Sequence, residues 1–175
     1  MGIFAQDFKD AVIHPTLTQI DQWSPATEAL LLGTAAIMSN LGSTLHTEQD
    51  NRQYGIYLTD KKTHRKVWDE YLAFDCDLAS KVRGFASQRL FLVDPEQELV
   101  TNLAYATAIA WATYRISTKN LPQDPTNLPA LAQCWFDHYP HANINLAQQE
   151  KTIEYFVTNM QLMNQMPPGQ PLLVA

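Results

Sequence analysis

Few residues of this 175-residue chain have the type and spacing that catalysis requires. Glu48 and Asp50 are two carboxylates close together in a polar stretch, and a carboxyl pair is the usual equipment for general acid and base catalysis. The same polar surroundings favour solvated loop residues, which is how we interpret both. Glu28 falls in the first turn of a predicted helix, where a negative charge interacts favourably with the helix dipole.

Metal-binding and redox patterns are equally weak. His138 and His141 form an HxxH pair, but Pro140 between them prevents the single helical face that a histidine metal pair needs. Cys76 and Cys134 stand too far apart for a CxxC motif, and we expect two reduced, mostly buried thiols. The sequence has no phosphate-binding glycine loop and no Ser/His/Asp order. We therefore expect neither a metal nor a cofactor.

The charge pattern argues against two classes of partner. The formal net charge is −6, and residues 61–66, KKTHRK, form the one basic cluster. A short cluster without interleaved aromatic residues is typical of a solvated helix start, so we expect no nucleic acid as partner. No stretch approaches the roughly 20 apolar residues that span a bilayer. The first fifteen residues also lack the apolar segment of a secretory signal, which favours synthesis in a cytoplasm.

The elements that position these residues are predicted to be helices. Hydrophobic residues make up 46% of the chain and charged residues 17%, a balance typical of one globular domain. We expect a mainly α-helical domain of about six or seven helices over residues 1–165, with a short hairpin near 54–58, and an extended Pro-rich tail over 166–175. Helical periodicity and capping signals place the helices at about 4–13, 25–40, 63–72, 77–85, 94–116, 131–138 and 146–163.

Individual start and stop signals sharpen this expectation. Pro15 is expected to end the first helix, and Ser24 followed by Pro25 is a strong start for the second. Thr63 is expected to cap a later helix, and Asp94 with Gln97 resembles a capping box. The segment 103–116 is apolar on nearly every face, which predicts a helix at the centre of the domain.

Two stretches carry a family resemblance. LLLGTAAIMSNLG at 30–42 is followed, after a gap, by YGIYLTDKKTH at 54–64 and then by Trp68. This pattern resembles the lytic transglycosylase-like proteins of phage particles, in which a helix reads about LLLGTAAQES-x-LG and the following loop reads GIYQMEPATH. The resemblance continues through KVRGFASQRLFL and ELVTNLAYATAIAW, and so covers about residues 5–117. It implies a lysozyme-like fold.

The resemblance also implies a reaction that this chain is poorly equipped to perform. In the family a glutamate at the end of the helix protonates the glycosidic oxygen of peptidoglycan, which requires a raised pKa. Here Met38 occupies that position, and Leu58 replaces the glutamine of the loop. A thioether cannot transfer a proton, so no catalytic residue is expected. The residues that the resemblance places along the cleft are Ser39, Gly55, Tyr57, Leu58 and Thr63.

A retained scaffold without its acid favours a structural role. The resemblance implies a non-catalytic component of a phage particle, in the neck, the tail or the ejected internal proteins, made in the host cytoplasm and then carried in the virion. Copies of itself and other phage structural proteins are the expected partners. The alternative is a virion protein that binds or cleaves peptidoglycan, with Glu48 as the candidate displaced acid.

Overall fold

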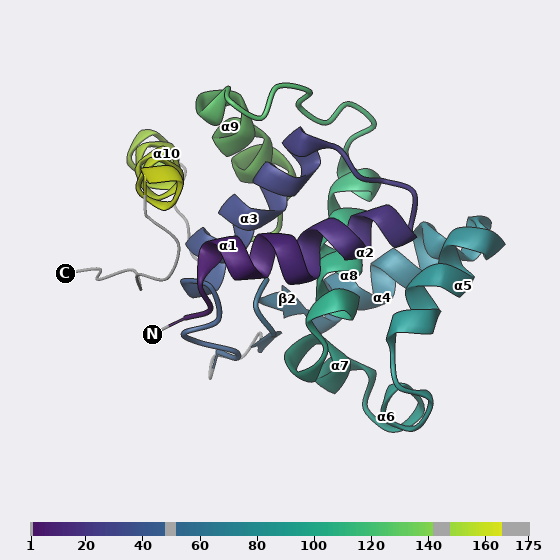
Figure 1. The fold of residues 1–175 in the computed structure, drawn as a ribbon. Helices are drawn as coiled ribbons and strands as arrows, with labels where there is room; N and C mark the ends of the chain where they lie inside the picture. Colours follow the sequence, from purple (N-terminus) through teal and green to yellow (C-terminus); the bar gives the residue numbers. More distant parts are fainter. Residues whose placement is uncertain (1, 48–51, 142–147, 166–175) are drawn as a thin grey trace.

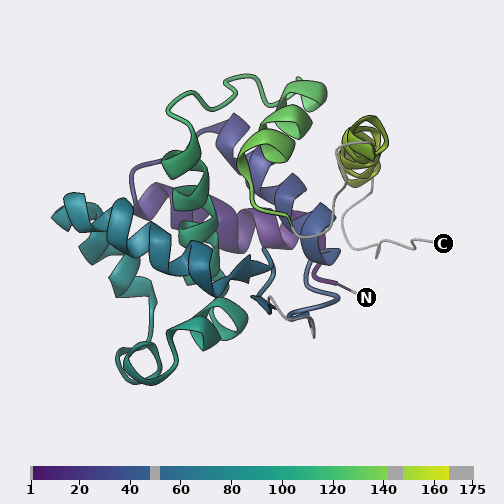
Figure 2. The ribbon, with the colours of Figure 1, turned by 180° about the vertical axis from the view of Figure 1, so that it is seen from behind.

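The computed structural model describes residues 2–47, 52–141 and 148–165. Within these ranges the chain is mainly α-helical, with one short antiparallel hairpin (Figures 1 and 2). The expected mainly α-helical class with a short hairpin is thereby confirmed, although the helices are more numerous than six or seven. The lysozyme-like fold that the resemblance implies stays a prediction. Glu48, Asp50 and the proposed tail over 166–175 lie outside the described residues.

The helices follow one another with short connections, and the hairpin interrupts them after the first third of the chain. The α-helices are α1 (Ala5–Phe8), α2 (His14–Gln19), α3 (Pro25–Ser39), α4 (Lys61–Glu70), α5 (Cys76–Phe85), α6 (Gln88–Val93), α7 (Pro95–Thr101), α8 (Leu103–Ser117), α9 (Leu128–His138) and α10 (Gln149–Gln165). A π-helical segment η1 (Lys9–Ile13) and a 3₁₀ turn η2 (Leu72–Phe74) complete the helical set. The strands are β1 (Gln53–Tyr54) and β2 (Thr59–Asp60).

The first helix does not end before Pro15. Segments α1, η1 and α2 form one uninterrupted helical run from Ala5 to Gln19, and Pro15 lies inside it (Figure 1). A proline ring lacks an amide hydrogen and clashes with the carbonyl four residues earlier. The π-helical turn η1 immediately before Pro15 is wider than an α turn and accommodates this mismatch. The expected stop was wrong for this reason.

Helix α3 begins as predicted. The Ser24 side chain accepts a hydrogen bond from the backbone N–H of Thr27 at 3.1 Å, and Pro25 opens the first turn. Its end is marked by more than one residue with a positive φ angle. Asn40 and Leu41 already have positive φ angles of 49° and 53°, and Gly42 follows at 83°. Three successive left-handed residues reverse the chain sharply after the helix.

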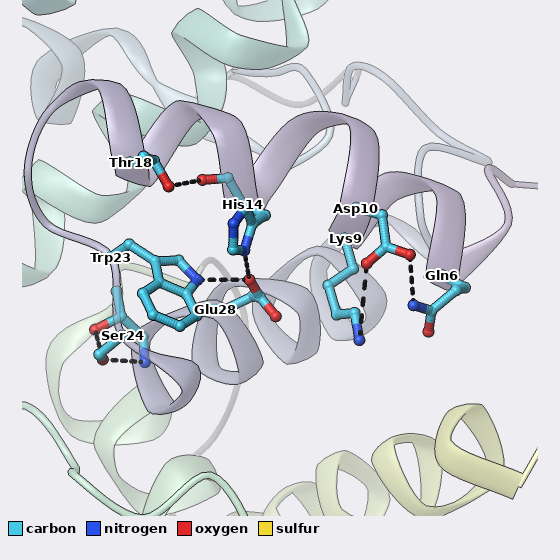
Figure 3. Close-up of polar contacts among 9 residues, drawn as sticks. Gln6, Lys9, Asp10, His14, Thr18, Trp23, Ser24 and Glu28 are labelled. Carbon is cyan, nitrogen blue, oxygen red and sulfur yellow. Dashed lines mark hydrogen bonds and ion pairs between the residues drawn. The ribbon is translucent and has the colours of Figure 1, made fainter.

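A carboxylate joins the first helical run to α3. Glu28, in the first turn of α3, accepts hydrogen bonds from His14 at 2.9 Å and from the Trp23 indole at 2.8 Å (Figure 3). The His14 and Trp23 rings meet edge to face, with centroids 4.9 Å apart. Glu28 therefore fixes the crossing of two helices in addition to the predicted interaction with the dipole.

The two strands of the hairpin flank most of the segment 54–58 in which the hairpin was predicted. Gln53 pairs with Asp60 and Tyr54 with Thr59, so residues 55–58 form the connecting turn. Gly55 has φ 75°, and a Cβ there would lie 1.8 Å from the Leu99 carbonyl oxygen of α7. Only glycine allows the hairpin to approach α7 this closely. The predicted alternation from Tyr54 to Leu58 therefore belongs to a buried turn.

Helix α8 is the centre of the domain. It packs between the first helical run on one side and α4 on the other (Figures 1 and 2), and it also contacts α3, α5, α7 and α9. Every residue from Tyr105 to Tyr114 is buried. The prediction of a central apolar helix over 103–116 is confirmed. Its expected continuity with the preceding segment is not, because Asn102 interrupts the helix and caps α8 through the Tyr105 amide at 3.0 Å.

Two other helix starts differ from the expectation. Asp94 precedes α7, but its side chain makes no capping hydrogen bond, so the predicted capping box is absent. Helix α4 begins at Lys61, and Asp60 rather than Thr63 is its N-cap. The predicted start of α7 at Asp94 is therefore correct in position but lacks the capping bond, whereas the cap of α4 lies three residues before the predicted Thr63.

Helix α10 packs against the small residues of α3. A Cβ at Gly33 would lie 2.2 Å from the Phe156 ring, because α10 packs across α3 at this point. Phe156 is 1% exposed and stacks on Trp135 of α9 with ring centroids 5.8 Å apart. The close approach to α3 at Gly33 is therefore made by a side chain of this same domain.

The burial of α8 predicts a strong effect of charge in its middle. Ala110→Glu places an unpaired carboxyl where the side chain is 0% exposed, and we expect a loss of several kcal/mol in unfolding free energy. Ala73→Glu, at an exposed alanine, is the matched control and is expected to change stability little. Urea denaturation followed by circular dichroism measures both. Equal stability of the two variants would show that α8 is peripheral.

Candidate functional site

The end of α3 is fastened to the hairpin by Ser39. Its hydroxyl lies 2.5 Å from the carbonyl oxygen of Ile56 and 3.2 Å from that of Ala35, and it accepts a hydrogen bond from the Gly42 amide at 2.9 Å. The Ser39 side chain is buried, and its donor and acceptor are both satisfied inside the protein. In this structure Ser39 holds the α3 terminus against the turn of the hairpin.

Tyr57 is buried in the same turn, and both its hydroxyl group and its backbone carbonyl form hydrogen bonds. The Thr107 hydroxyl donates to the Leu103 carbonyl, so Tyr57 Oη is the donor to Thr107 Oγ1 at 3.3 Å. Its backbone carbonyl accepts a hydrogen bond from Tyr139 Oη at 3.1 Å. Burial raises the pKa of both tyrosines well above its ordinary value, so both rings stay neutral hydrogen-bonding groups.

Leu58 and Thr63 lie beside a small hollow at the hairpin. Together with Tyr139 and Pro140, they line it next to β2. Leu58 has φ 46°, a left-handed conformation that a leucine rarely adopts, and its side chain is largely buried. Thr63 donates its hydroxyl to Asp60 at 2.8 Å and its amide to the same carboxylate at 2.9 Å.

Met38 sits close to this region without being enclosed. It is half-buried and packs against the hydrophobic core. It follows Thr34 by four residues, so both lie on one face of α3. Thr34 Oγ1 on that face accepts a hydrogen bond from Tyr114 Oη at 2.6 Å, because its own hydrogen goes to the Leu30 carbonyl. The face of α3 that carries Thr34 and Met38 is thus directed toward Tyr114 of α8.

A polar cluster that the sequence did not reveal lies on the other side of the hairpin. Tyr105 Oη accepts a hydrogen bond from the Trp68 indole at 2.9 Å, and it lies 2.6 Å from His64 Nε2. An indole N–H can only donate, so Tyr105 Oη is the acceptor from Trp68 and keeps its own hydrogen, which it can donate to an unprotonated His64 Nε2. His64 is buried, where the sequence suggested a simple helix-start residue. The spacing of His64 and Trp68 on one helical face was the available signal.

The buried carboxylates are also engaged. Glu98 is 1% exposed and accepts hydrogen bonds from the Ser87 amide at 3.0 Å and from the Asn102 side chain at 3.3 Å. Glu96 is buried and lies 3.6 Å from the Lys61 ammonium. These contacts make both groups structural anchors of α7.

The remaining candidates are placed as follows. Cys134 is buried, which raises the pKa of its thiol to about 11, but Cys76 is exposed, so the expectation of two buried thiols was half wrong. Within the described residues no group of three or more His, Cys, Asp or Glu side chains is arranged to hold a metal ion. The structure therefore brings Ser39, Tyr57, Leu58 and Thr63 together around one hairpin, whereas the cleft that they were predicted to line stays a prediction.

Comparisons with protein-family models, with curated proteins and with solved structures gave no match. In the described ranges, no helix is long and apolar enough to cross a membrane.

The buried His64 predicts a specific pH dependence. Desolvation lowers the pKa of His64 to about 4, so the unfolded chain binds more protons than the folded chain between that value and the ordinary 6.5. Stability therefore falls as the pH drops through this window, by up to about 3 kcal/mol in total. His64→Gln should flatten this part of the stability curve, while His46→Gln, at an exposed histidine, should leave it unchanged. Urea denaturation at pH 7 and pH 4.5 tests it, and an unchanged curve for His64→Gln would refute it.

Proposed function

We propose that this chain is a non-catalytic structural component of a phage particle, built on a scaffold like that of the lysozyme-like transglycosylases. The sequence resemblance suggests the family, and one observation supports the absence of catalysis. The position of the expected acid holds Met38, a half-buried thioether packed against the core. Glycoside cleavage requires a proton donor there, and general acid catalysis contributes about two to four orders of magnitude in rate.

The surroundings of Met38 support the same conclusion. The hydroxyl groups of Ser39 and Tyr57 are engaged in hydrogen bonds inside the protein, and Leu58 is an apolar residue largely buried in the turn. A general acid needs a neighbouring polar group to orient it and a path to the substrate. The described residues around the hairpin hold the turn in place, and the carboxylate of the hairpin, Asp60, is engaged as the N-cap of α4.

The surface supports assembly with other subunits. Phe74 is 83% exposed, and Leu92 and Val93 are each 79% exposed. Leu92 and Val93 lie on α6, next to the half-buried Phe91, whereas Phe74 ends the 3₁₀ turn η2. Large apolar side chains that gather on the surface of a small domain are typical of contact regions. An assembled particle would remove them from water.

The first test is enzymatic. The purified protein is expected to release no soluble product from peptidoglycan, and Glu48→Gln is expected to change nothing, because neither Met38 nor a solvated loop carboxylate supplies a raised-pKa acid. A zymogram with hen egg-white lysozyme as positive control measures this. Lysis by the unmodified chain that disappears in Glu48→Gln would make the protein an enzyme with a displaced acid.

The second test asks what Met38 does. Met38→Glu is expected to lower the unfolding free energy by about 2 kcal/mol, because a carboxyl would enter a half-buried site packed against the hydrophobic core. Met38→Leu, which keeps volume and polarity, should cost less than about 1.5 kcal/mol. Thermal denaturation compares the two. If Met38→Glu is as stable as Met38→Leu, the site is open to water and the packing role assigned to Met38 is wrong.

The structural role is tested on particles. If the chain is a component of a phage, purified virions contain it in a fixed ratio to the other structural proteins, and quantitative mass spectrometry measures that ratio. Its absence from purified particles would overturn the proposal even if the isolated protein is inactive on peptidoglycan.

A further inference from the structure

Positive charge is concentrated on one surface of this acidic protein. Four exposed cations stand on α4, namely Lys61, Lys62, Arg65 and Lys66, and Arg52 lies beside them next to β1. They are five of the 12 Lys and Arg residues in a chain whose net charge is −6. We call these five residues the α4 cationic surface.

Two grooves meet on this surface. The first has a volume of about 600 Å³ and is lined by all five cations, with Tyr54, Asp69 and Glu70. The second, of about 380 Å³, lies between α4 and the ends of α8 and α9. Lys62 and Lys66 line both grooves. A chain-like ligand that leaves one groove across these lysines therefore enters the other.

Most of this charge is not neutralised. Lys61 lies 3.6 Å from Glu96 and Lys66 lies 3.8 Å from Glu70, yet these lysine side chains remain 53% and 48% exposed. Among the described residues, Arg52, Lys62 and Arg65 make no ion pair.

The helical spacing of these cations is itself unfavourable. Lys61 and Arg65, and likewise Lys62 and Lys66, stand four residues apart on α4, where like charges destabilise a helix. An anion between them removes this repulsion.

Besides its two lysines, the second groove is lined by a serine and a histidine. Ser117 and His138 are 2.9 Å apart, between Ser117 Oγ and His138 Nδ1, and both line the groove. Its one lining carboxylate, Asp60, already accepts two hydrogen bonds from Thr63 as the cap of α4. The groove thus presents ammonium, hydroxyl and imidazole groups, which are the usual ligands of phosphate oxygens.

We propose that the α4 cationic surface binds a chain of phosphate groups laid across α4 from the first groove into the second. Arginine and lysine side chains spaced along two joined grooves match an extended polyanion better than a single small ion. A protein partner fits less well, because Tyr54, Ile116 and Pro140 are the sole apolar or aromatic side chains among the described lining residues. This inference replaces the expectation of a merely solvated helix start, and it does not depend on the structural role proposed above.

The test uses the full-length protein and two probes that share only the phosphate chain. Fluorescence anisotropy measures binding of a labelled single-stranded oligothymidylate, and inorganic polyphosphate is the unlabelled competitor. At about 50 mM salt we expect binding that weakens as salt is added. Lys62→Gln/Lys66→Gln should weaken it about tenfold and lower the salt slope by about 1.4, since single strands lose about 0.7 per phosphate contact.

The matched control removes the same charge elsewhere. Lys119→Gln/Lys151→Gln neutralises two exposed cations outside both grooves and should leave affinity within about twofold. Circular dichroism confirms that both double variants are folded. Competition by polyphosphate supports recognition of phosphate alone, and a preference for the oligonucleotide identifies nucleic acid as the source of the phosphates. Absence of binding by both probes, or an equal loss in the control, overturns the proposal.

Discussion

The constraint on which the rest of the structure depends is the burial of α8 on every side from Tyr105 to Tyr114. A helix that contacts neighbours on all sides cannot expose its polar side chains to water, so each must find a partner inside the protein. Tyr114 donates to Thr34 of α3, Thr107 accepts from Tyr57 of the hairpin turn, and Thr113 donates to the carbonyl of Ile109. Tyr105 joins α4 through His64 and Trp68. These bonds orient α3, α4 and the hairpin around one axis.

The hairpin is the place where these constraints converge. Its turn approaches the backbone of α7 at Gly55, receives the α3 terminus through Ser39, and accepts the Tyr139 hydroxyl from beyond α9. Contacts from so many elements leave the turn little freedom, which explains how Leu58 is held in a left-handed conformation. A region of this rigidity suits either an active site or an internal brace. With Met38 beside it, the brace is the reading we propose.

The surface divides into regions of different chemistry. Leu92 and Val93 expose apolar side chains on α6, whereas the cations lie on α4 and beside β1. Apolar surface drives association with protein partners, and concentrated charge governs encounters with anions. Under the two proposals made above, separate parts of one small domain would contact protein neighbours and a phosphate-bearing chain.

The sequence by itself determined the helical class, the start of α3 at Ser24 and the central position of α8, because capping chemistry and all-round apolarity are local properties. Tertiary structure decided the continuation of the first helix through Pro15, the break at Asn102 and the cap at Asp60. It also decided that His64 is buried against Tyr105 and that Arg52 joins the lysines of α4. These outcomes depend on contacts between residues tens of positions apart or on backbone adjustments such as a π turn. Neither can be predicted from the spacing of residues along the chain.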